Sequence, residues 1–193
     1  MSYAAAQMDR MLAGLVIPCY VVAVDLVAAR VRVSDGGAWT SAWVRWHAQA
    51  AGKARHWRAP SLYEQGVLVS PSGEPAQGTF VPGLYGNAGP PPDNRDHVEV
   101  WRFEDGGSLV YDWAAKSYTI KLPTGTVSIE VGSSKAVITD AAINAESAAI
   151  KAKAPTITLE GSVEIVGSLR VTGDILGLGK IIDTAGNTAN HKH

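Results

Sequence analysis

The spacing of hydrophobic residues changes period along the chain. Residues 4–14 begin with three alanines and place Met8, Met11 and Leu12 at helical spacing, which predicts a short amphipathic helix within residues 1–15. From Val16 the apolar residues follow an alternating pattern instead. Strands are predicted at 16–35 with a break near 25–29, and then at 40–47, 66–69 and 78–81, with turn signals at 35–37 and 71–75.

About five short strands within roughly 75 residues are typical of a small Greek-key barrel such as the OB-fold. We assign this barrel to residues 16–86. Three successive prolines, Pro90 to Pro92, follow in a segment rich in Gly and Asn, and they disfavour both helix and sheet. We therefore place a linker at residues 87–97.

Strand patterns resume after the linker and then shorten. Alternating residues predict strands around 98–100, 109–111, 118–122 and 127–131, separated by Gly or Pro turns. Beyond them, short apolar positions and glycines recur at six to nine residues, which suggests a β-helix over residues 98–182. The recurring positions are Ile143, Ile150, Ile157, Ile165, Val171 and Ile175, with Gly161, Gly167 and Gly173. A chain of such narrow strands leaves its sheet edges open, so we expect three chains to intertwine as a homotrimer. The fold class is all-β: a short N-terminal helix, an OB barrel and an intertwined triple-stranded β-helix.

The aromatic residues support two different architectures. All six Trp, six Tyr and two Phe lie at or before Tyr118. A core without aromatic rings is thin, as expected for strands that wrap closely around a narrow axis.

Net charge and cysteine content limit which partners and covalent cross-links we expect. The formal net charge is −1, so no overall basic field attracts nucleic acid, and we expect no nucleic-acid partner. The single cysteine, Cys19, permits no intrachain disulfide and is expected to be a small buried hydrophobe. The N-terminus lacks a basic-then-apolar pattern, so we expect no signal peptide.

Several short sequence segments resemble those of a known protein family. They are Val24-Asp25, Arg30 to Val33, the run from Tyr63 to Glu74, and Gly78 to Val81, followed by the β-helix pattern. Together they resemble the baseplate assembly protein V family, the central spikes of contractile phage tails, and within that group the spikes of R-type pyocins. The resemblance implies a spike at the baseplate tip of a phage tail or bacteriocin particle, which pierces the target cell outer membrane. It also implies synthesis in the bacterial cytoplasm. Its partners would be tail hub and baseplate proteins. Some relatives carry a lysozyme domain or a terminal effector, for which this chain leaves no room, so we expect no enzyme activity.

The chain ends with His191-Lys192-His193, within an apex that we place at residues 183–193. On a strand both imidazoles would face the same side, and three chains would supply six, which suits an octahedral first-row transition metal and not tetrahedral zinc. The resemblance implies one iron ion per trimer, bound by six nitrogens of His191 and His193. A polar tail or the remnant of an expression tag is the alternative.

Two other functions remain open from the sequence. Aromatic and basic residues between 39 and 58 resemble the base-stacking platforms of OB-fold nucleic-acid-binding proteins. The near-zero charge of this half of the chain favours the alternative, in which they fill the barrel and its contacts between chains and form salt bridges. They are Trp39, Trp43, Trp46 and Trp57 with Arg45, His47, Arg55, His56 and Arg58. The second is a β-helix acyltransferase. The repeats of those enzymes keep a strict six-residue register, whereas the repeats of this chain vary between six and nine residues.

Overall fold

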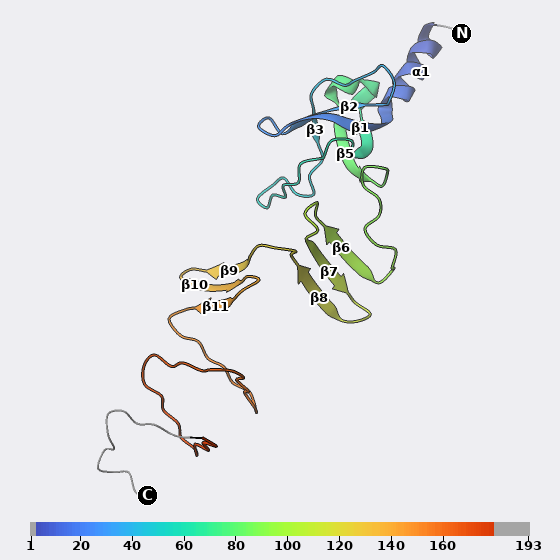
Figure 1. Cartoon of the computed structure of the whole chain (residues 1–193). Helices are drawn as coiled ribbons and strands as arrows, with labels where there is room; N and C mark the ends of the chain where they lie inside the picture. The colour runs from blue at the N-terminus through green and yellow to red at the C-terminus, as the bar shows by residue number, and fades with distance from the viewer. Residues whose placement is uncertain (1–2, 180–193) are drawn as a thin grey trace, which may run out of the picture. The chain divides into compact units, whose positions relative to one another are not determined.

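The computed structural model describes residues 3–179, which divide into two compact units. The first unit holds helix α1 and strands β1 to β8, and the second holds strands β9 to β11 (Figure 1). Between residues 3 and 179, no helix is long and apolar enough to cross a lipid bilayer.

Helix α1 spans Tyr3–Leu15, which confirms the helix expected from the spacing of its apolar residues. The backbone N–H of Ser70 donates to the carbonyl oxygen of Leu15 at 2.8 Å and ties the end of the helix to the barrel. Gly14 lies against the short 3-10 helix η1, Pro71–Gly73, so closely that a Cβ there would lie 2.6 Å from the carbonyl oxygen of Gly73. The helix is therefore attached through backbone contact, and Met8 and Leu12 stay exposed.

Five strands close into a barrel in the order β1-β2-β3-β5-β4. Strands β3 and β5 pair in parallel and the other neighbours pair antiparallel, and the predicted five-stranded barrel is confirmed. The strands are β1 (Val16–Asp25), β2 (Arg30–Ser34), β3 (Val44–Trp46), β4 (Gln65–Val69) and β5 (Thr79–Leu84).

Alternate residues of the barrel strands fill its core, as the period of a strand requires. The buried side chains are Cys19, Val21, Val31, Val33, Val44, Leu68 and Phe80. Burial raises the pKa of the Cys19 thiol to about 11, which keeps it protonated at neutral pH and confirms it as a small buried hydrophobe.

Strand β3 is shorter than the predicted strand over 40–47, and Ser41 is the reason. Its hydroxyl accepts a hydrogen bond from the backbone N–H of Val33 at 3.0 Å, while its own N–H donates to the carbonyl of Val33 at 2.8 Å. A side chain that takes the place of a backbone partner interrupts the ladder. Regular pairing with β2 therefore begins only at Val44.

Two three-stranded antiparallel sheets follow the barrel along the chain. The first has the order β6-β7-β8, from strands Val98–Arg102, Ser108–Asp112 and Ser117–Lys121. The second has the order β9-β10-β11, from strands Val127–Val131, Ser134–Ile138 and Ile143–Glu146. The strands predicted around 98–131 are confirmed.

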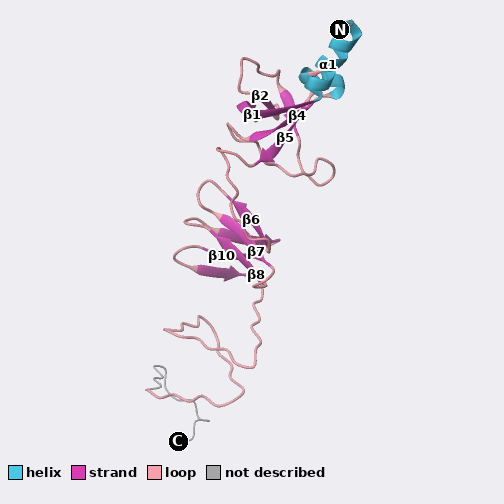
Figure 2. Ribbon diagram, turned by 90° about the vertical axis from the view of Figure 1, so that its right-hand side faces the viewer, coloured by secondary structure: helices cyan, strands magenta, loops and turns pink. Residues whose placement is uncertain are grey.

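Residues 147–179 form no strand in the single chain (Figure 2), although the sequence predicts short strands there. The physical reason lies in the kind of fold. Strands of an intertwined β-helix pair with other chains, so one chain alone offers them no backbone partner.

Candidate functional surfaces

The predicted metal ligands, His191 and His193, lie outside the described residues, as does the whole apex at 183–193. Within residues 3–179, no group of three or more His, Cys, Asp or Glu side chains is placed to hold a metal ion. The metal site therefore remains a prediction that rests on the terminal histidines.

The aromatic and basic residues between 39 and 58 divide into separate environments. Trp39 and Trp46 pack against the barrel core, and Trp57 meets Trp46 edge to face with ring centroids 5.4 Å apart. Trp39 and Trp46 thus complete the barrel, as expected if this cluster fills it, whereas Trp43 and Trp57 are 42% and 62% exposed.

Two of the basic residues in this cluster bond to neighbouring barrel segments. The Arg45 Nε donates to the Thr79 hydroxyl at 2.9 Å, which joins β3 to β5. The Arg58 guanidinium forms an ion pair of 2.8 Å with Glu64. Both guanidinium groups are held by the protein itself, as expected of structural arginines.

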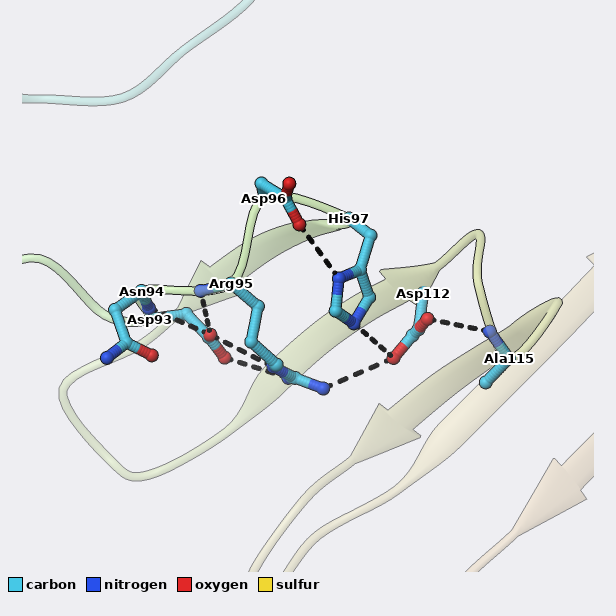
Figure 3. Close-up of polar contacts among 7 residues, drawn as sticks. All are labelled: Asp93, Asn94, Arg95, Asp96, His97, Asp112 and Ala115. Atoms are coloured by element: carbon cyan, nitrogen blue, oxygen red, sulfur yellow. Dashed lines mark hydrogen bonds and ion pairs between the residues drawn. The ribbon is translucent and has the colours of Figure 1, made fainter.

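The linker ends in a charged cluster that sequence reasoning did not identify (Figure 3). The guanidinium of Arg95 lies between two carboxylates: Nη2 and Nε contact Asp93 at 2.8 and 3.0 Å, and Nη1 contacts Asp112 of β7 at 3.2 Å. The Asp93 carboxylate also accepts the backbone N–H groups of Asn94 and Arg95. The hydrogen bond from Arg95, above all, holds the pKa of Asp93 well below its usual range.

His97 extends this cluster toward the sheet. Its Nδ1 lies 3.0 Å from Asp96, and that hydrogen bond lowers the pKa of the Asp96 carboxyl. Its Nε2 lies 3.9 Å from Asp112, and its backbone carbonyl accepts the N–H of Trp113 at 3.2 Å. The linker thus joins the first sheet through an ordered set of polar contacts. In the sequence, the charged run from Asp93 to His97 could have indicated this cluster. Asp112, which binds Arg95, could not have been found in the same way because it is remote in sequence.

The segment after the barrel exposes the apolar positions that recur in the sequence. Ile143 is 79% exposed and Ile150 is 68% exposed, and the later members of the series are exposed as well: Ile157, Ile165, Val171 and Ile175. Regularly spaced apolar side chains left open over such a length mark a surface for association.

A second exposed apolar surface belongs to helix α1. Met8, Met11, Leu12 and Leu15 line an open hollow of about 360 Å³ together with Ala4, Gln7 and Ser72. Methionine side chains adapt to partners of irregular shape, so this hollow is a candidate contact for another protein.

Comparison with known proteins gives matches over most of the chain. Residues 17–85 match the type VI secretion system/phage-baseplate injector OB domain, and residues 99–177 match the Gp138 beta helical trimerization domain. The Spike protein of Escherichia phage P2 is 28% identical over 195 aligned residues, which cover 97% of this chain and 90% of that protein. The trimerization domain supports a homotrimer, and the injector domain supports association with a baseplate. The chain thus consists of a phage-baseplate injector OB domain followed by a β-helical trimerization domain, and it is similar over nearly its whole length to a phage spike protein.

Proposed function

We propose that the chain is the central spike at the tip of a contractile tail, belonging to a phage or to an R-type bacteriocin, and that it pierces the target cell outer membrane. The observation that supports this most is the order of the two matched domains, an injector OB domain followed by a trimerization domain. Its work would be mechanical and not enzymatic, driven by contraction of the tail sheath. Helix α1 and the barrel would attach the spike to the tail hub.

Stiffness follows from the proposed trimer. The exposed Ile and Val side chains of residues 143–175 would be buried between chains, and β-branched residues pack well on pleated strands. Backbone hydrogen bonds between chains would close the sheet edges that one chain leaves open. A shaft of this kind transmits an axial load without bending at flexible joints.

We propose that His191 and His193 hold an iron ion at the apex, one per trimer. Their chemistry suits this role: imidazole nitrogens bind first-row transition metals, and three chains offer the six donors of an octahedral set. A bound ion would supply a cross-link among the three chains at the apex. His191 and His193 would thereby keep the point from fraying under load.

The piercing role can be tested on assembled tails. Tails lacking this chain, tails carrying the wild type, and tails carrying His191→Ala/His193→Ala are compared for outer-membrane permeation of sensitive cells, measured with a dye that the membrane excludes. We expect the wild type to permeate, the tails without the chain to fail, and the double variant to be about tenfold weaker. Equal permeation by tails without the chain would contradict the proposed function.

The apex makes a separate prediction about metal content. Untagged wild type should contain one iron per three chains by plasma emission spectrometry, while His191→Ala/His193→Ala should contain none and remain trimeric. The ion should be released in acid, well below the ordinary imidazole pKa of about 6.5, because protons must compete with the metal for the ring nitrogens. A trimeric wild type without metal at neutral pH would contradict the clamp and leave the shaft intact.

A further inference from the structure

One side of the sheet β6-β7-β8 is aromatic and uncovered. Strand register places Glu99 opposite Tyr111 and Trp101 opposite Leu109, and then Tyr111 opposite Tyr118 and Leu109 opposite Ile120. Because residues paired across strands share a face, these six side chains lie on one side of the sheet. We call this side the aromatic face; it comprises Glu99, Trp101, Leu109, Tyr111, Tyr118 and Ile120.

The aromatic face is open in the single chain. Trp101 is 50% exposed, Tyr118 is 62% exposed and Ile120 is 49% exposed. The rings of Tyr111 and Tyr118 lie 6.3 Å apart and, with Trp101 and Leu109, line a shallow hollow of about 120 Å³. Large rings exposed together are rare on the surface of a protein that has no partner.

The indole N–H on this face already has a hydrogen-bond acceptor. The indole Nε1 of Trp101 donates to the carboxylate of Glu99 at 3.1 Å. An indole N–H that is satisfied within its own chain can be covered by apolar groups without losing a hydrogen bond. The face can therefore pack against another apolar surface without an unsatisfied Trp101 N–H.

The opposite side of the same sheet suits water instead. It carries mainly polar and charged side chains: Arg102, Ser108, Asp112, Ser117, Thr119 and Lys121. The remaining residues of this side, Val98, Val100 and Val110, are half-buried. Asp112 also bonds to Arg95 at 3.2 Å, so the linker cluster lies on this polar side. The two sides of the sheet thus differ sharply in polarity.

We propose that the aromatic face packs against other copies of this chain and forms a wide apolar core at the beginning of the trimerization domain. The occupant follows from position, since all residues of the sheet except Val98 lie within the range that matches that domain, 99–177. Rings fill a broader core than the Val, Ile and Ala residues of the following segment. This inference rests on the trimer of the proposed function and assigns the face through which its copies first meet.

Thiol accessibility tests the face directly. Ile120 and Thr119 are neighbours on β8, both exposed in the single chain, and they lie on opposite sides of the sheet. In the full-length protein, the Ile120→Cys thiol should react with Ellman's reagent about tenfold more slowly than the Thr119→Cys thiol, and denaturant should abolish the difference. Cys19 is common to both variants and is subtracted through the wild type. Equal rates, or a protected Thr119→Cys thiol, would overturn the proposal.

A second pair of cysteine variants on β8 keeps the test usable if one variant of the first pair does not fold. Tyr118→Cys lies on the aromatic face and Ser117→Cys on the polar side, and the same order of rates is expected. The mass of the wild type, measured by light scattering on the same samples, separates the two claims. A trimer with equal thiol rates would overturn the aromatic face alone, whereas a monomeric wild type would overturn the trimeric spike as well.

Discussion

Gly66 shows how one missing side chain allows the barrel to close. It lies in β4 between Cys19 of β1 and Pro82 of β5, and it is buried. A Cβ at this position would lie 2.6 Å from the Phe80 ring and would collide with the carbonyl oxygen of Val81. Phe80 belongs to the core, so the ring has little room to move.

Gly66→Ala should therefore lower the free energy of unfolding of the barrel by about 1–3 kcal/mol, the usual cost of overpacking. Urea unfolding followed by tryptophan fluorescence measures this change. Gly52→Ala is the control, because a Cβ at Gly52 meets no atom within 4 Å, and its effect should stay within about 0.5 kcal/mol. Equal effects of the two substitutions would contradict the packing described for Gly66.

Arg95 makes a prediction about pH. Because its hydrogen bonds depress the pKa of Asp93 below the ordinary 3.8, the Asp93 contribution to stability is present above that value and is lost as the pH falls below it. Arg95→Gln should raise the midpoint of Asp93 toward 3.8, as measured by NMR titration of the carboxyl carbon. Arg102→Gln, in the sheet that carries Asp112, should leave the Asp93 midpoint depressed. An Asp93 midpoint unchanged by Arg95→Gln would refute the assigned contact.

Helix α1 depends on Gly14 in a way that helix propensity alone would not suggest. Gly→Ala inside a helix normally stabilises it by up to about 1 kcal/mol. At Gly14 the new methyl group would press on the backbone of Gly73, so the sign should reverse. Hydrogen exchange of the α1 amides should become faster in Gly14→Ala while the amides of the barrel strands keep their protection.

Asp9→Ala is the matched substitution, since it raises helix propensity at an exposed position. It should leave α1 exchange unchanged or slower. If Gly14→Ala also slowed exchange in α1, the attachment of the helix through backbone contact would be wrong.

The elements with strong periodicity were predictable from the sequence. The helix, the barrel strands and the strands from 98 to 131 follow from spacing and turn residues, and Cys19 follows from its apolar surroundings. Ser41 was not predictable, because its hydroxyl competes with the backbone only once β2 lies beside it. Asp112 was missed as a partner of Arg95 because the two are 17 residues apart and meet only through the sheet. The conformation of the segment after Glu146 was the least predictable from one sequence, since its predicted strands need backbone partners from other chains.

Association of chains is the claim on which the remaining inferences depend. The chain leaves apolar side chains exposed on the aromatic face and along residues 143–175, and residues 99–177 match a trimerization domain. Burial of this surface between copies would supply the main driving force for assembly, since apolar area removed from water stabilises by about 25 cal/mol per Å².

The mass of the full-length, untagged protein in solution, measured by light scattering, tests this claim most directly. We expect three times the 20.3 kDa of one chain, maintained on dilution. A mass equal to one chain at the same concentrations would contradict the trimeric spike, and with it the shared apex and the packing of the aromatic face.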